Sequence, residues 1–130
     1  MVRSSKKARR LVVGGETFLW SLGHEHRLEQ GRYRDCRETL TIRRLGARGR
    51  LLIVFQAGAG RRVPDGYLPS GAVGAAEGGL LNLHEPGTVR ALLDEAMTGG
   101  WHPNDPPAAQ MDGWLLFDTV AVRRGVTPPA

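Results

Sequence analysis

One segment carries a complete set of helix signals: PGTVRALLDEAMT, residues 86–98. Its apolar side chains recur at the spacing of one helical face; they are Val89, Leu92, Leu93, Ala96 and Met97. Pro86 suits the first turn, where a helix has no partner for that N–H, and Gly99-Gly100 supplies a stop. We predict one amphipathic helix over residues 86–98, which needs a sheet to cover its apolar face.

The sequence before this helix predicts strands. We expect a hairpin of residues 9–13 and 16–27, turned by Gly14-Gly15. An alternating strand follows over residues 35–45, after a polar loop at 28–34. Residues 50–56 are apolar on both faces, which indicates a central strand covered by the helix. Four strands therefore precede the helix.

Alternation along these strands assigns their side chains to two faces. The apolar face takes the even positions Phe18, Trp20, Leu22, Cys36, Glu38, Leu40 and Ile42. The opposite face is wet and basic and includes Arg37 and Arg43. His24 and His26 continue the even register, so we expect both imidazoles at the rim of the core.

The rest of the chain predicts loops and one more strand. The glycine-rich residues 58–79 read as a loop that hides one short strand, near 61–63 or near 72–73. Residues 102–110 carry three prolines and predict a crossing loop. Residues 114–122 are rich in apolar side chains and predict a final buried strand.

Together these elements predict one α+β domain at residues 9–124. We expect an antiparallel sheet of about five strands with one helix packed on one face, in the order ββββ(β)αβ. A mobile basic arm at residues 1–8 and a disordered tail at 125–130 flank the domain. The expected core is Phe18, Trp20, Leu22, Leu40, Ile42, Ile53, Phe55, Val89, Leu92, Leu93, Ala96, Trp101 and Trp114.

Composition restricts the function classes. A chain of 130 residues can bury a core without disulfides or metal. Cys36 is the only cysteine, so no internal disulfide forms, which fits a reducing cytoplasm. No apolar run approaches the roughly 20 residues that cross a bilayer, and we expect no signal peptide. We therefore predict a cytoplasmic protein without a membrane partner.

The net charge of +5 is unevenly distributed. Residues 1–62 hold 15 Lys/Arg against 5 Asp/Glu, a net charge of +10, whereas residues 63–130 hold 3 against 8, a net charge of −5. Such a division is typical of a face for nucleic acid or for an acidic partner. A solvated sheet face that happens to use arginine is the simpler explanation of the same division. Arginine outnumbers lysine 16 to 2, which is typical of a GC-rich genome.

His24-Glu25-His26 is the strongest candidate for chemistry. Two histidines at i and i+2 of a strand point the same way and can share a metal ion. Further ligands would come from Glu29, Cys36, Glu38, His84 or His102. The triplet partly resembles the cupin His-x-His motif, but Phe18 stands where that motif has a glycine and Pro69 where the second motif has a histidine.

Other catalytic motifs are missing from the sequence. Gly58-Ala59-Gly60 is not followed by a helix, as a phosphate-binding turn would be. No serine lies in a nucleophile elbow. Cys36 falls on the apolar register, which is typical of a core residue. We predict no catalytic residues and no cofactor.

The helix and its exit carry a resemblance. Pro86, Val89, Leu92, Leu93 and Ala96, followed by Gly100-Trp101-His102-Pro103, resemble a pattern of small uncharacterised bacterial proteins. In that pattern a proline-started helix after several strands ends in Gly-Trp-x-Pro. The resemblance implies a fold and no activity.

Three functional hypotheses follow. The first is a non-catalytic binding or accessory module for a macromolecular, acidic partner; the second is a nucleic-acid-binding protein using the basic arm and sheet face. Candidate binding residues for both are Lys6, Lys7, Arg9, Arg10, Arg37, Arg43, Arg61 and Arg62. The third is a metal-dependent enzyme with a His24/His26 centre. A second copy of the chain is a further candidate partner, because it would close an exposed sheet edge.

Overall fold

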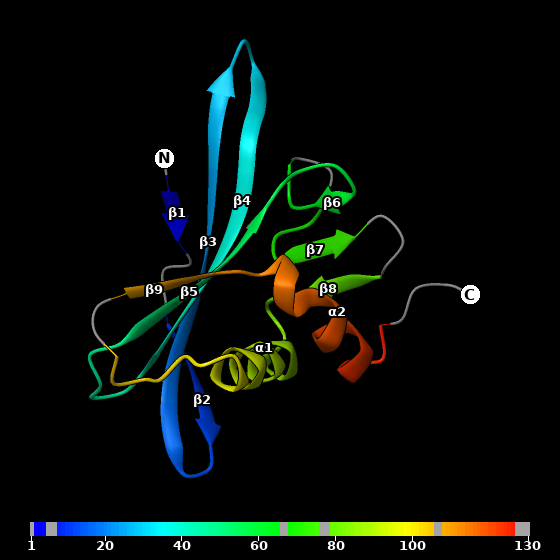
Figure 1. Cartoon of the computed structure of the whole chain (residues 1–130). Helices are drawn as coiled ribbons and strands as arrows, with labels where there is room; N and C mark the ends of the chain where they lie inside the picture. The colour runs from blue at the N-terminus through cyan, green and yellow to red at the C-terminus, as the bar shows by residue number, and fades with distance from the viewer. Residues whose placement is uncertain (1, 5–7, 66–67, 76–78, 106–107, 127–130) are drawn as a thin grey trace.

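The computed structural model describes residues 2–4, 8–65, 68–75, 79–105 and 108–126. It shows an α+β architecture with two helices (Figure 1). The elements in chain order are β1 (Val2–Ser4), β2 (Arg9–Val13), β3 (Glu16–Glu29), β4 (Arg32–Arg44), β5 (Arg50–Gln56), β6 (Arg61–Arg62), β7 (Ala72–Ala75), β8 (Leu80–Asn82), α1 (Pro86–Thr98), β9 (Ala108–Asp112) and α2 (Trp114–Arg123).

The larger sheet has six strands in the order β1-β3-β4-β5-β9, and β2 shares the β3 edge with β1. All its pairings are antiparallel except that of β5 with β9, which is parallel. The sheet is therefore mixed and not purely antiparallel as predicted. The four strands expected before the helix are confirmed. Of the residues assigned to a mobile arm, Val2–Ser4 pair with β3.

A second sheet of three short strands, β6-β7-β8, forms from the glycine-rich segment and the residues after it. The sequence predicted one short strand near 61–63 or near 72–73, and both positions are strands. Strands of two to four residues give too little alternation to be recognised in sequence.

The core lies between the larger sheet and the two helices (Figure 1). Every residue of the predicted core is buried. The helix predicted at residues 86–98 is α1, with the same bounds, and most of its apolar stripe is buried. Met97 is the exception, because it lies in the last turn and is 39% exposed.

The final strand was predicted in the wrong place. Residues 114–122 belong to helix α2, and the strand is β9, which begins inside the predicted crossing loop of residues 102–110 and ends at Asp112. Buried side chains in α2 follow helical spacing; they are Trp114, Phe117, Val120 and Ala121. The carboxylate of Asp112 accepts a hydrogen bond from the Trp114 N–H at 3.0 Å, which satisfies a free donor in the first turn.

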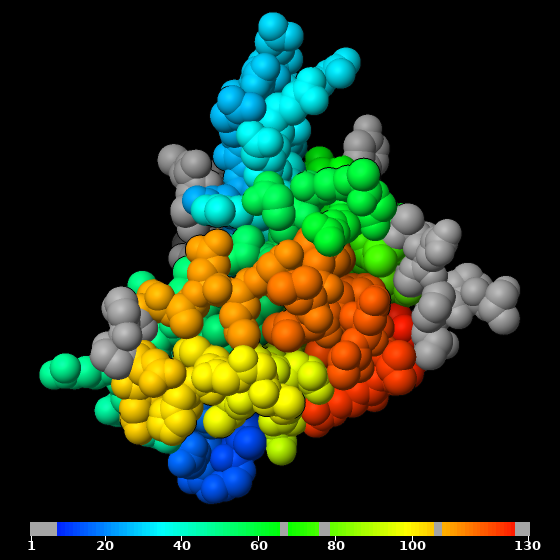
Figure 2. Space-filling model, viewed as in Figure 1, coloured from blue at the N-terminus to red at the C-terminus, as the bar shows by residue number. Residues whose placement is uncertain are grey.

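The β3–β4 hairpin is longer than predicted. Residues 28–34, expected to form a loop, extend both strands up to a tight turn at Gln30-Gly31, where both residues have positive φ. The hairpin projects away from the helices (Figure 1), and its tip stands clear of the molecule in Figure 2. Neither described helix has the length and apolar character needed to cross a membrane.

Candidate functional site

The face of the larger sheet opposite the core, here called the open face, is the candidate site. Strand register places one set of side chains on it, since directly paired residues share a face. The set comprises Arg10 of β2, Leu19, Ser21, Gly23 and Glu25 of β3, Arg37, Thr39, Thr41 and Arg43 of β4, Arg50, Leu52, Val54 and Gln56 of β5, and Ala108, Gln110 and Asp112 of β9. Both helices pack on the other face, where the core is.

Three arginines form one cross-strand row at one end of the open face. Arg10 pairs with Leu19, Leu19 pairs with Arg43, and Arg43 pairs with Arg50. We call Arg10, Arg43 and Arg50 the arginine row. All three are exposed, and none forms an ion pair with any residue that the structure describes. Like charges directly opposite each other destabilise a sheet, so an anion bound here would relieve repulsion.

A shallow hollow occupies the middle of the open face. Its volume is about 240 Å³, and its lining is mostly small or uncharged; the lining is Ser21, Gly23, Glu25, Arg37, Thr39, Thr41, Leu52, Val54 and Gln110. Leu52 and Val54 form an apolar floor, and Val54 is only 8% exposed. A second hollow of about 270 Å³ shares Arg37, Val54 and Gln110 with the first and extends to Asp112 and Trp114. The two hollows together are therefore long enough to take several side chains of an extended peptide.

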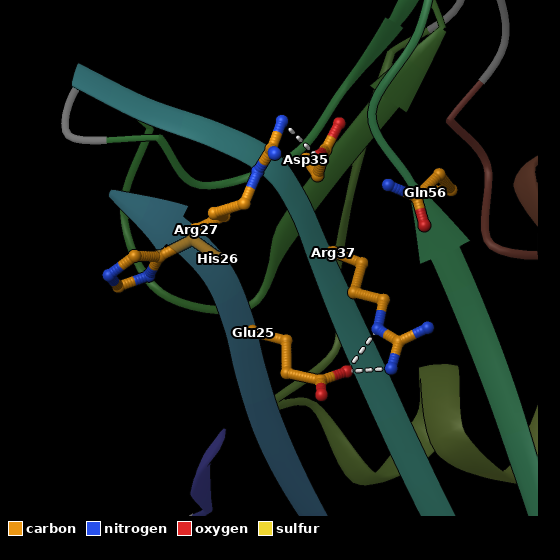
Figure 3. Close-up of a pocket in the computed structure, with 6 residues that line it drawn as sticks. All are labelled: Glu25, His26, Arg27, Asp35, Arg37 and Gln56. Atoms are coloured by element: carbon orange, nitrogen blue, oxygen red, sulfur yellow. Dashed lines mark hydrogen bonds and ion pairs between the residues drawn. The ribbon is translucent and has the colours of Figure 1, made fainter. Parts of the chain in front are cut away.

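The far end of the open face carries paired charges (Figure 3). A pocket of about 200 Å³ lies there. Arg37 donates from Nε and Nη2 to the Glu25 carboxylate. Arg27 lies 3.0 Å from an oxygen of Asp35 and 3.1 Å from one of Glu29. Within these ion pairs the positive and negative charges cancel. The excess of positive charge on the open face therefore lies at the arginine row.

The predicted binding residues separate into different places. Arg10 and Arg43 lie in the arginine row. Arg37 shares the open face but is paired with Glu25. Lys6 and Lys7 lie outside the described residues.

The other three predicted arginines lie off the open face or at its margin. Arg9 lies over the Trp20 ring at 5.3 Å on the core side, and its Nη1 donates to the His84 carbonyl at 3.4 Å. Arg61 lies over the Trp114 ring at 5.7 Å and lines the second hollow. Arg62 is exposed on β6 of the smaller sheet.

Arg50 was not among the predicted binding residues. It begins an apolar strand, and its sequence neighbours suggest only a turn. Its position opposite Arg43 depends on how residues 45–49 connect β4 to β5, because that connection fixes the register. Arg50 could have been found in the sequence by pairing the two predicted strands residue by residue, starting from the short connection between them.

The rings of His24 and His26 lie side by side, with centroids 5.2 Å apart, as expected for two histidines on one face of a strand. His24 Nδ1 is hydrogen-bonded to Glu38, its cross-strand partner. The His26 ring packs edge-on against Tyr33, with centroids 4.3 Å apart, and points away from the Glu25–Arg37 pair (Figure 3). Among the described residues, no group of three or more His, Cys, Asp or Glu side chains could hold a metal ion.

Glu38 is a buried carboxylate at the edge of the core, with 1% of its surface exposed. Burial raises the pKa of Glu38 above its ordinary value, and hydrogen bonds from His24 and from the Gly71 N–H oppose that change. Cys36 lies on the same face of β4 and is buried, as predicted for a core residue. Burial, and after it the nearby carboxylates, raises the pKa of the Cys36 thiol, which disfavours the nucleophilic thiolate.

The sequence matches no protein-family model, and neither a curated protein nor a solved structure matches it. The resemblance of residues 86–103 to small uncharacterised bacterial proteins stays a prediction.

Proposed function

We propose that this protein is a non-catalytic binding module that holds an acidic segment of a partner protein on the open face. The observation that supports this most is the arginine row. Three exposed arginines from three strands lie there in one cross-strand row, without an ion pair to a carboxylate of the described chain. Carboxylates of a bound segment would pair with them and relieve the repulsion between Arg43 and Arg50.

The hollow beside the arginine row supports the same proposal. Its small hydroxyl and apolar side chains leave room for the side chains of an extended segment, with Leu52 and Val54 as floor. A segment with acidic residues at one end and apolar residues at the other therefore complements both parts of the open face.

A protein segment fits this face better than single-stranded nucleic acid does. Bases bind such surfaces mainly by stacking on exposed aromatic rings. Within the described part of the open face and its hollows the aromatic side chain is Trp114, which is 9% exposed and has Arg61 over its ring. Asp112 at the other end would also repel phosphates.

Binding of a fluorescent glutamate-rich peptide tests the proposal. The Arg10→Ala/Arg43→Ala variant removes two charges from the arginine row, whereas Arg32→Ala/Arg34→Ala removes two exposed charges from the hairpin tip. Two exposed ion pairs contribute about 0.4–2 kcal/mol, so the first variant should lose about two- to thirtyfold in affinity. The tip variant should lose less than about threefold, and equal losses would contradict the proposal.

Nucleic acid is measured in the same experiment. Single-stranded and duplex DNA of mixed sequence compete with the peptide across a salt series. If DNA displaces the peptide at low salt and its binding falls steeply with salt, the nucleic-acid hypothesis replaces this one. Binding of neither peptide nor DNA at low salt, where charge attraction is strongest, would overturn both.

A further inference from the structure

Strand β9 is an edge of the larger sheet, and its outer side has no strand partner in the described chain. The Gly113 N–H donates to the Val54 carbonyl at 2.7 Å, so Gly113 faces β5. Because backbone groups alternate sides along a strand, Ala109 and Met111 also face β5. Ala108, Gln110 and Asp112 therefore direct their N–H and C=O groups outward.

This outer edge is accessible. Ala108, Gln110 and Asp112 are all exposed, and the orange residues of β9 lie on the surface in Figure 2. The edge contains no lysine or proline, the residues that usually protect an edge strand from pairing. Such an edge favours pairing with another strand.

We propose that two copies of the chain pair antiparallel through β9, with Gln110 on the twofold axis. Gln110 then pairs with Gln110 of the second copy, and Ala108 pairs with Asp112 of the second copy at both ends. All three outward-facing residues exchange N–H and C=O groups in this register, which uses the whole five-residue strand. The sheet then continues through both copies.

Charge complementarity selects this register. Arg50 pairs with Ala108 within one copy, and Ala108 carries only a methyl group. The Asp112 of the second copy would lie two strands from Arg50, roughly 10 Å between Cα atoms, on the same face. An arginine and an aspartate side chain together span that gap. Each dimer thus gains two Arg50–Asp112 ion pairs between copies, and each Arg50 gains the carboxylate that it lacks within its own chain.

The core-side face of β9 and the ends of the strand favour the same register. Ala109 would lie against Met111 of the second copy, and both are half-buried apolar residues at the margin of the core. A shift by two residues in either direction would lose the Ala108–Asp112 pair and leave part of the five-residue strand without a partner.

The dimer places both open faces on the same side, because the twofold axis is perpendicular to the sheet. A partner with two acidic segments would then be held at Arg10 and Arg43 of both copies, because Arg50 of each copy pairs with Asp112 in the dimer. The proposal goes beyond the binding function, since either can hold without the other. A five-residue edge is smaller than a standard interface, so we expect dissociation in the micromolar range.

Cysteine cross-linking tests the register directly. In a Cys36→Ala background, Gln110→Cys places one cysteine of each copy at the twofold axis. Their Cα atoms would be about 5.5 Å apart, which is within the range for a disulfide. Ala108→Cys is the matched control, because its two copies lie on opposite sides of the axis. Under mild oxidation we expect a covalent dimer from Gln110→Cys and not from Ala108→Cys. Equal cross-linking of the two variants, or none from Gln110→Cys, would overturn the proposal.

Sedimentation of the unmodified chain gives a second readout that needs no cysteine. Across about three decades around micromolar concentration, the mass should rise from 14.2 kDa toward twice that value. Arg50→Glu should weaken dimerisation at least about tenfold, since it places two carboxylates together at each end. A mass that stays at one chain throughout would overturn the proposal, as would an acidic peptide that protects β9 amides from exchange in a monomeric chain.

Discussion

Glu38 is one of two buried polar side chains in the described part of the chain, the other being Thr88. Its position was visible in the sequence, because it falls on the even register between Cys36 and Leu40. Its pairing with His24 was not, since the sequence does not show that the two strands place these residues opposite each other. Because of this register, Glu38, a candidate metal ligand in the sequence, is hydrogen-bonded to His24 in the structure.

The raised pKa of Glu38 predicts a pH dependence of stability. Between its ordinary value of 4.5 and its raised folded value, the folded chain binds more protons than the unfolded chain. The free energy of unfolding therefore falls as pH rises through that interval, by about 1.4 kcal/mol for each unit of difference. Glu38→Gln removes this ionisation, so the stability of the variant minus that of the natural chain should increase as pH rises above about 4.5.

Urea unfolding from pH 4 to 8 measures that difference. The same pair of chains in a His24→Asn background removes the imidazole that is hydrogen-bonded to Glu38 and isolates the effect of burial. A difference that stays constant or decreases with pH would show that burial does not govern this carboxyl.

Gly113 is a second residue at which a substitution has a predictable effect on stability. A Cβ there would come within 2.5–2.7 Å of the Phe55 ring, which is buried and cannot move aside. Gly113→Ala should reduce the free energy of unfolding by about 1–3 kcal/mol. Gly58→Ala is the control, since nothing lies within 4 Å of its Cβ, and should change stability by less than about 0.5 kcal/mol. Equal effects in urea unfolding would contradict the packing described here.

Among the elements, α2 is where sequence and structure differ most. Residues 114–122 form an apolar run that is compatible with either a strand or a buried helix. Hydrophobic periodicity alone does not distinguish these two structures in so short a run. The flanking signal was Asp112, whose side chain accepts a hydrogen bond from the first turn of the helix. Strand β9 has low intrinsic β-propensity and forms because it pairs with β5, a tertiary effect that no local pattern encodes.

Two alanine substitutions in α2 test the helix. In a strand, Leu115 and Phe117 would share a face, whereas in the helix Phe117 is 2% exposed and Leu115 is 79% exposed. We expect Phe117→Ala to cost about 3–5 kcal/mol of stability and Leu115→Ala less than about 0.5 kcal/mol. Similar losses from both in thermal or urea unfolding would favour the strand.

The strands of the larger sheet were predictable because they alternate or begin at clear turns. Their order was not, since the parallel pairing of β5 with β9 joins segments on either side of α1. The candidate site has the same limit. Alternation placed Arg37 and Arg43 on one face, but only register shows that Glu25 neutralises Arg37 while Arg43 meets Arg10 and Arg50 in a row.

In the whole molecule, positive charge belongs mostly to the strands of the larger sheet and negative charge to the segments after them. The arginine row places part of that excess on the open face, away from the helices. Acidic ligands should therefore approach the open face in preference to the helical face, and high salt should weaken this attraction.

An NMR titration with a glutamate-rich peptide is the most direct test of the binding face. The Nε–H signals of arginine report on each guanidinium separately, and the chain has 16 arginines. We expect the largest shifts at Arg10 and Arg43, which stay unpaired in the dimer, with amide shifts along the same face of β3, β4 and β5. Shifts confined to the hairpin tip around Arg32 and Arg34, or to the helices, would contradict binding at the open face.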